Sequence, residues 1–307
     1  MPLWQSASLR LFLWGLGLAV TALPRRMELA LGGLLGSAAL ALGLFKREIA
    51  EENIRRALPE LSAADRERIL ARNFEHMGRL FFEYAHFFSP VPGHYRRYAA
   101  ANSRLHGIEN WEKARAKGRG VLIVSLHLGW WEMQAASGGL AGMPLTVVTT
   151  VLKPAWLHRL ITARRLETGV RAAFHPGSVP AVLKALRRGE AVAFMNDQYA
   201  PAPMGLRVRF FGAVVDTLSA VGLLARRTGA PIIPATSYRD EDGVTRVFLG
   251  TELDLGADLD DPLKATQALA AIVEKNVRER PEQWLWVHRR FKHAEWPAEA
   301  RLLRKSQ

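Results

Sequence analysis

The chain has 307 residues, no cysteine, and a formal net charge of +13 from 42 Lys and Arg against 29 Asp and Glu. Its apolar content of 49% excludes a disordered chain, and the lack of cysteine excludes a disulfide-stapled module, a thiolate zinc site and a cysteine nucleophile. The length fits one large domain or two small ones. The positive charge favours an anionic partner: nucleic acid, an anionic membrane surface, or an acidic protein or phosphorylated substrate.

The N-terminal part differs in composition from the rest. It carries apolar runs of fourteen uncharged residues at 11–24 and seventeen at 29–45, whereas a membrane-spanning helix needs about 20 apolar residues. We expect residues 1–47 to form a helical membrane anchor with one spanning or deeply inserted segment, and residues 48–307 to form the main domain. The alternative is a helical hairpin buried in a soluble domain. Basic residues beside the runs suit anionic lipid headgroups on the cytoplasmic side: Arg25, Arg26, Lys46 and Arg47.

The rest of the chain alternates between helical and strand patterns. Residues 49–88 have apolar positions three and four apart, which is typical of helices. Short apolar runs bounded by Gly, Pro and charged residues predict strands at 120–126, 145–151, 191–195, 231–237 and 244–250. Helical patterns lie at 131–138, 156–168, 178–188, 219–228 and 266–278. This alternation predicts an α/β fold with a mostly parallel central sheet flanked by helices on both faces.

The segment VLIVSLHLGWWEMQ is the strongest chemical signal. His127 follows a buried strand at its carboxyl end, where sites form in open α/β sheets, and Glu132 comes five residues later. Across a strand–turn–helix corner the two side chains can converge, and a His paired with a carboxylate is a general base. On spacing alone, Glu132 can equally be an exposed helix residue. Because no nucleophile elbow is present, the pattern favours direct transfer over a covalent acyl-enzyme.

Recognisable motifs are spread along nearly the whole chain: ENIRRALPEL at 52–61, RNFEHMGRLFFE at 72–83, HLGWWE at 127–132, RRLETG at 164–169, NDQ at 196–198, FFG at 210–212 and PEQWLWVHRRFK at 281–292. Together they resemble the late acyltransferases of lipid A biosynthesis, within the glycerolipid acyltransferase group marked by His-x4-Asp or His-x4-Glu. Trp130 departs from the Asn that is usual in the histidine block of that family.

The resemblance implies a fold like that of glycerol-3-phosphate acyltransferase and a location at the bacterial inner membrane, with the active site on the cytoplasmic face. It implies transfer of a fatty acyl chain from acyl carrier protein, or from acyl-CoA, to a hydroxyl of a lipid A precursor. His127 would be the base and Glu132 its partner. Neither a metal nor an organic cofactor is expected. An anionic membrane lipid is a further expected partner, because the chain is basic.

Four other residues are candidates for substrate binding. Arg165 matches the Arg-x3-Gly element and would clamp a phosphate or the donor, or orient Glu132, while Arg164 is the adjacent alternative. Asp197 ends a predicted strand on the same edge as His127, where it would hold a substrate group or cap a loop, and Gln198 follows the same reasoning.

Several readings stay open at this stage. Phe210 and Phe211 line an acyl channel or pack in the core, and the basic run at 288–292 is a phosphate site or a solvated tail. The acceptor can also be another glycolipid, a lysophospholipid or an aminolipid. A basic membrane- or nucleic-acid-binding protein without catalysis is the third hypothesis, although no recognisable nucleic-acid module is present.

Overall fold

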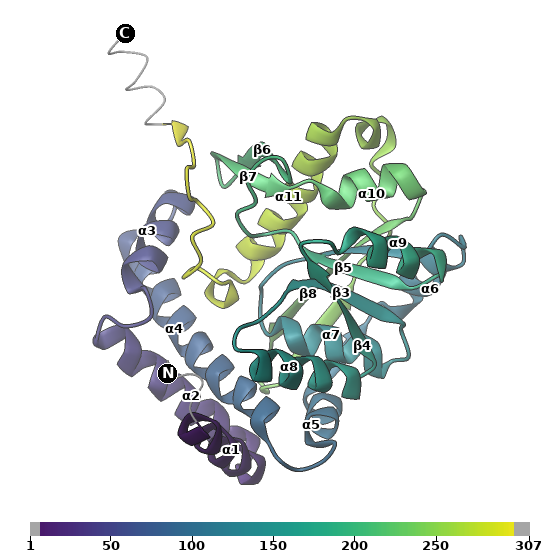
Figure 1. The fold of residues 1–307 in the computed structure, drawn as a ribbon. Coiled ribbons are helices and arrows are strands. Elements are labelled where there is room, and N and C mark those ends of the chain that lie inside the picture. The colour runs from purple at the N-terminus through teal and green to yellow at the C-terminus, as the bar shows by residue number, and fades with distance from the viewer. Residues whose placement is uncertain (1–6, 298–307) are drawn as a thin grey trace.

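The computed structural model describes residues 7–297. Figure 1 shows a central sheet between layers of helices, with the four N-terminal helices packed against one side of it. The expected α/β architecture with a mostly parallel sheet is therefore confirmed.

The main sheet has seven strands in the order β1-β9-β8-β2-β5-β3-β4. Every neighbouring pair is parallel except β8 with β9, so β9 and β1 run opposite to the other five. The strands are β1 (Ser103–His106), β2 (Val121–Ser125), β3 (Leu145–Thr150), β4 (Val170–His175), β5 (Ala191–Met195), β8 (Ile232–Arg239) and β9 (Thr245–Leu249). A separate antiparallel hairpin joins β6 (Gly205–Phe210) to β7 (Ala213–Leu218).

Helices cover both faces of the sheet, which explains why β2 is buried at every position and apolar at all but the last, Ser125. One face carries Ile123, Leu145 and Val147 and packs under α6 (Ile108–Arg115) and α7 (Trp131–Leu140). The other face carries Val124 and Phe194. It packs under α9 (Val179–Arg187), α10 (Ala220–Thr228) and α11 (Pro262–Glu279). The remaining helices are α5 (His94–Asn102), α8 (Ala155–Glu167) and the short η2 (His86–Phe88), η3 (Gly256–Asp260) and η4 (Pro281–Gln283).

The N-terminal helices are α1 (Ala7–Ala22), α2 (Arg25–Ala41), α3 (Arg47–Ala57) and α4 (Ala63–Ala85). Helices α2 and α4 pack closely because glycines face one another: an added Cβ on Gly78 would lie 2.1 Å from the carbonyl oxygen of Gly32. A Cβ on Gly36 would likewise lie 1.9 Å from the carbonyl oxygen of Phe74. Backbone contact at this distance ties α2 to the rest of the fold.

The expected spanning segment is not found in the part of the chain that the structure describes. Within residues 7–297, no helix combines the length and the apolar character that a membrane crossing requires. A break at Leu23 and Pro24 divides the N-terminal region into helices of 16 and 17 residues, and Arg25 and Glu28 are in the second of them. A boundary between two units near residue 47 stays a prediction.

The predicted strands and helices are confirmed within a few residues at their ends. The sequence patterns missed β1, β4, the β6–β7 hairpin, α5 and α6. Strand β4 is an edge strand whose alternation is blurred by a surface arginine, Arg171, and by small alanines. The acidic stretch 254–261 contains the short helix η3, none of whose residues is buried.

Candidate active site

The turn after β2 places His127 at the carboxyl edge of the sheet. The strand ends at Ser125 and α7 begins at Trp131, so the chain reverses direction over five residues. Gly129 has φ +61° and no room for a side chain, because a Cβ there would lie 2.6 Å from the carbonyl oxygen of Ser237. The Gly129 amide donates to the carbonyl oxygen of Gln283, which fastens the turn to the C-terminal segment.

Asp197 is the carboxylate that contacts His127. Strand β5 lies parallel beside β2 with Met195 opposite Ser125, so Asp197 emerges at the same edge as the histidine. The His127 Nδ1–H donates to Asp197 Oδ1 at 2.8 Å, and the His127 backbone amide donates to Oδ2, also at 2.8 Å. Since the Asp197 carboxylate can only accept, the imidazole holds its proton on Nδ1 and leaves Nε2 free to accept one.

Asp197 is 2% exposed and is held by a third donor, the indole Nε1–H of Trp284 at 2.8 Å. Burial by itself would raise the pKa of the Asp197 carboxyl. The electrostatic interaction with His127 and the hydrogen bonds from His127 and Trp284 outweigh that effect and lower the pKa of Asp197 below its usual value. The carboxylate is therefore kept ionised, in the state that supports an imidazolium beside it.

The C-terminal segment that carries Trp284 is itself held by two buried asparagines. Asn73 on α4 donates through Nδ2 to the carbonyl oxygens of Trp284 and Glu282, at 2.7 and 3.0 Å. Asn53 on α3 donates in the same way to Trp286 and His288. Both asparagines lie within the motifs at 52–61 and 72–83, and no local sequence signal indicates their contacts or that of Trp284.

Glu132 does not bond to His127, which corrects the expected pairing. Its two carboxylate oxygens accept from Arg165 on α8, from Nε at 2.9 Å and from Nη2 at 2.7 Å. Burial would lower the pKa of Arg165, but the charge of Glu132 and their hydrogen bonds raise it. A carboxylate in the first turn of α7 meets the guanidinium of the neighbouring helix, while the end of β5 brings Asp197 to the imidazole. Of the readings left open for Arg165, the structure thus shows contact with Glu132.

The other predicted residues divide between the cavity and the scaffold. The Gln198 amide lies 3.4 Å from His127 Nε2 and lines the cavity described below, as Arg165 does. Arg164 instead donates to the carbonyl oxygens of Phe87 and Ser89, at 2.8 and 2.6 Å, and does not line that cavity. It braces η2 against α8.

The aromatic residues also have distinct places. Trp130 is fully buried, whereas the edge of Trp131 meets the His127 ring at a centroid distance of 4.8 Å and lines the cavity. Phe210 and Phe211 pack in the core against Trp284. For these two residues the structure shows core packing and not an acyl channel.

Of the basic run at 288–292, Arg290 is buried. It donates to the carbonyl oxygens of Gln198, at 3.1 Å, and of Asp216. Burial lowers the pKa of Arg290 to about 10. Arg290 therefore supports the Gln198 backbone from inside the protein and is neither a headgroup site nor a solvated side chain.

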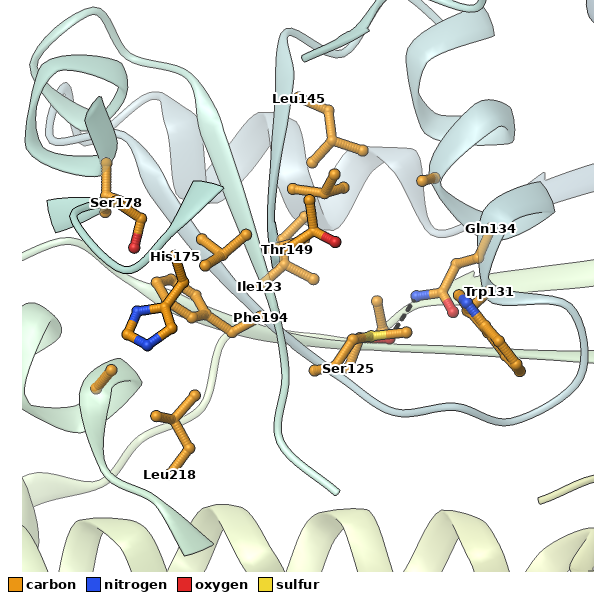
Figure 2. A pocket seen from close by; sticks show the side chains of 18 of the residues that line it. Ile123, Ser125, Trp131, Gln134, Leu145, Thr149, His175, Ser178, Phe194 and Leu218 are labelled. Carbon is orange, nitrogen blue, oxygen red and sulfur yellow. Dashed lines mark hydrogen bonds between the residues drawn. The ribbon is translucent and has the colours of Figure 1, made fainter. Parts of the chain in front are cut away.

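A cavity of about 800 Å³ begins at His127 and is lined by residues from both faces of the sheet. Figure 2 shows Ser125, Gln134 and Trp131 on one side of the central strand and His175, Ser178 and Leu218 on the other. We call the part of the cavity on the α7 side the closed arm, because most of its lining side chains are buried: Leu105, Ile123, Ala135, Gly138, Met143, Leu145, Val147, Ala235, Val247 and Leu249. We call the part on the α9–α10 side the open arm, because its lining includes exposed apolar side chains: Val148, Ser178, Val179, Val182, Phe194, Met204, Ala220, Leu223 and Leu224.

The sequence profile of the family "Bacterial lipid A biosynthesis acyltransferase" matches residues 5–293. The chain belongs to this family. It is 28% identical over 277 residues to the lipid A biosynthesis lauroyltransferase of Escherichia coli (strain K12), covering 89% of this chain and 88% of that one. It is 27% identical over 272 residues to the lipid A biosynthesis palmitoleoyltransferase of the same strain, covering 88% and 86%.

Among solved structures, the chain is similar to the 1-acyl-sn-glycerophosphate acyltransferase PlsC of Thermotoga maritima, with a TM-score of 0.38 and 14% identity, covering 85% of this chain and 99% of that one. The resemblance found in the motifs is thus confirmed, and with it the assignment as an acyltransferase. His127 lines a cavity whose other lining side chains are mostly apolar.

Proposed function

We propose that the protein transfers a fatty acyl chain from acyl carrier protein to a hydroxyl of a lipid A precursor, at the cytoplasmic face of the bacterial inner membrane. The observation that carries this proposal is the His127–Asp197 pair at the mouth of the apolar cavity, in a chain of this family. An acidic carrier protein and a phosphorylated lipid both suit a chain with a net charge of +13.

The reaction follows from the tautomer of His127. Its free Nε2 takes the proton of the acceptor hydroxyl, while Asp197 stabilises the imidazolium that forms. The hydroxyl oxygen bonds to the thioester carbonyl carbon, and the carbonyl electron pair moves onto oxygen. When the tetrahedral intermediate collapses, the carbon–sulfur bond breaks and the leaving thiolate takes the proton from His127 Nε2. Proton and electrons therefore balance without any further reactant.

The oxyanion of that intermediate needs donors nearby. No side chain among the described residues caps the start of α7, so the backbone amides of its first turn stay available next to His127. The Arg165–Glu132 ion pair fixes this turn against α8, which makes both side chains positioning residues in this proposal. The Gln198 amide, beside Nε2, holds the acceptor hydroxyl against the base.

The closed arm suits the donor chain. Its walls are deeply buried, with Ile123 2%, Leu145 3% and Leu249 5% exposed. Because it crosses from β3 to β1, a distance of five strand spacings, it extends roughly 24 Å. When the methyl end of an acyl chain enters this arm, its thioester end, which is the end tethered to the carrier, lies at His127.

The N-terminal helices suit the membrane surface. Large apolar side chains are exposed on α1, on α2 and in the loop between α2 and α3: Leu11, Phe12, Trp14, Leu18, Met27, Leu31, Leu34, Leu35, Leu42, Leu44 and Phe45. Arg10 of α1 lies over the Trp156 ring of α8 at 5.9 Å, so α1 is close to the helix that carries Arg165. Apolar faces of this kind insert into the interface between headgroups and acyl chains, and basic residues add attraction to anionic lipid.

One experiment tests the reaction. Purified protein is incubated with acyl carrier protein or coenzyme A loaded with a fatty acid, together with an under-acylated lipid A precursor. The masses of the lipid products are then measured by mass spectrometry. We expect a product heavier by one acyl group from the carrier protein, and none from His127→Ala. Transfer only from the coenzyme A thioester would identify acyl-CoA as the donor. Transfer only to an added lysophospholipid or glycolipid would identify that lipid as the acceptor. No transfer from folded protein would refute the proposal.

Flotation with vesicles tests the membrane assignment. We expect binding to vesicles that contain anionic lipid, and loss of it in Phe12→Glu together with Leu34→Glu. Leu263→Glu on α11 is the matched control, since Leu263 is an exposed leucine outside the N-terminal face. Equal flotation of the double variant and the control would refute this contact.

A further inference from the structure

The open arm differs from the closed arm in its rim. Val179 is 52% exposed, Met204 42% and Leu223 40%, and all three line the cavity. Large aliphatic side chains gathered at the mouth of a cavity that reaches a catalytic base indicate a ligand with apolar groups of its own. Figure 2 shows Leu218 and Phe194 on this side of the central strand, away from Trp131 and Gln134.

The apolar lining follows one face of α10. Ala220, Leu223 and Leu224 stand at positions i, i+3 and i+4, and Arg227 at i+7 ends the stripe. At 1.5 Å per residue, Ala220 and Arg227 are about 10 Å apart along the helix. Val179 and Val182 of α9 and Phe194 of β5 line the same cavity. The arm is thus a short apolar slot, open along its rim.

We propose that the open arm binds an acyl chain of the acceptor lipid. This inference rests on the proposed function, in which the acceptor is a lipid and brings apolar chains to the site as well as its hydroxyl. The closed arm holds one tethered chain with a free methyl end, whereas a chain attached to a large headgroup has to enter from the side. The exposed lining of the open arm permits such entry, whereas the buried lining of the closed arm does not.

The experiment separates the two arms by using water as the alternative acceptor. Without lipid, slow hydrolysis of the acyl thioester reports the base and the donor arm. With lipid, the KM for acceptor reports the open arm. Two acceptors are compared, an under-acylated lipid A precursor and an analogue of it with shortened chains.

We expect Leu223→Glu to raise the KM for the long-chain acceptor at least about tenfold, because a charge replaces an apolar contact, while thioester hydrolysis continues. The short-chain analogue should bind with little change between the variant and the unmodified protein. Leu223→Ser is the milder second variant, in case the charge disturbs α10, and Leu263→Glu, outside the cavity, is the control.

The outcomes are distinct. If Leu223→Glu slows hydrolysis and leaves the acceptor KM alone, the arm holds the donor chain and the inference is wrong. If the variant affects both acceptors equally, or neither, the arm does not bind an acceptor chain. If the unmodified protein neither hydrolyses the thioester nor transfers the chain, the proposed function fails and takes this inference with it.

Discussion

Arg165 on α8 holds the carboxylate of Glu132 on α7 with two hydrogen bonds, at 2.9 and 2.7 Å. The side chains are 11% and 9% exposed, so solvent screens the pair little. Because α7 begins directly after the turn that carries His127, this ion pair fixes the start of α7 relative to α8. The hydroxyl of Tyr95 donates to the backbone oxygen of Glu132 at 3.3 Å and braces the same turn from α5.

Removing both partners of this pair should cost less than the two single losses added together. Arg165→Met or Glu132→Gln alone leaves a largely buried charge or donor unpaired, which costs about 3–5 kcal/mol of unfolding free energy. The double variant should lose less than the sum of the two single variants. Urea unfolding of all four proteins in a double-mutant cycle measures this. Additive losses would show that the two residues act independently.

Asp197→Asn should lower turnover about 10²–10⁴-fold while changing the KM for either substrate little, because an amide no longer fixes the proton on Nδ1 of His127 or stabilises the imidazolium. Steady-state transfer kinetics measure the split between kcat and KM. Asp254→Asn, at an exposed loop position, is the matched control. If Asp197→Asn kept full turnover and a stably folded Glu132→Gln lost it, the original His127–Glu132 pairing would be favoured again.

The same carboxylate should contribute to acid stability. The pKa of Asp197 is lower in the folded protein than in the unfolded chain, where it is about 3.9. Its contribution is therefore complete above about pH 4 and is lost as the pH falls through the lower, folded value. Guanidinium unfolding between pH 2 and pH 5 should show a steeper loss for the unmodified protein than for Asp197→Asn. Parallel curves would contradict the depressed pKa.

The sequence predicted the sheet and the place of the base for physical reasons. Buried parallel strands are continuous apolar runs, and sites in open α/β sheets form at the carboxyl ends of such runs, which is where His127 lies. The shared edge of two parallel strands also placed Asp197 near His127. Spacing could not show which of the two carboxylates, Glu132 or Asp197, meets the imidazole. The choice depends on how the turn that carries His127 is oriented, and tertiary contacts determine that orientation.

Contacts between residues far apart in the sequence could not be predicted from the sequence. Asn73 lies on a helix face, and nothing local indicates that its amide meets the Trp284 backbone 211 residues later. The apolar runs near the N-terminus indicated an exposed apolar surface but did not show whether a helix spans a membrane. They also could not show that α2 packs against α4, because the contact between Gly78 and Gly32 depends on tertiary structure.

Gly78→Val should separate α2 from α4. Its added side chain would collide with the backbone at Gly32 and Gly36, which have no side chains to move aside. We expect a loss of more than about 3 kcal/mol in unfolding free energy, at the upper end of overpacking effects. Gly15→Val is the control, because nothing lies within 4 Å of a Cβ there. Thermal unfolding of both variants measures the difference, and equal melting temperatures would contradict the packing.

A buried chain of contacts links α2 to the catalytic turn. Arg25 on α2 donates to Glu83 on α4, which also accepts from Arg239 on β8. Arg239 donates to His76 Nδ1 at 2.8 Å, and His76 Nε2–H donates to the Gly129 carbonyl oxygen at 3.2 Å. Burial, reinforced by the charge of Arg239, holds the pKa of His76 well below its usual value. His76 is therefore neutral, as both of its hydrogen bonds require.

This linkage makes His76→Gln a test of pH-dependent stability. A His whose folded pKa lies below the unfolded value of about 6.5 contributes stability that is complete above that pH and declines below it. Relative to His76→Gln, the unmodified protein should lose about 1.4 kcal/mol per pH unit between pH 6 and pH 5. Urea unfolding at pH 8, 6 and 5 measures the difference. A constant difference in unfolding free energy across these pH values would mean that His76 gains a second proton as readily in the folded protein as in the unfolded chain. The Nδ1 atom could not then accept the hydrogen bond from Arg239.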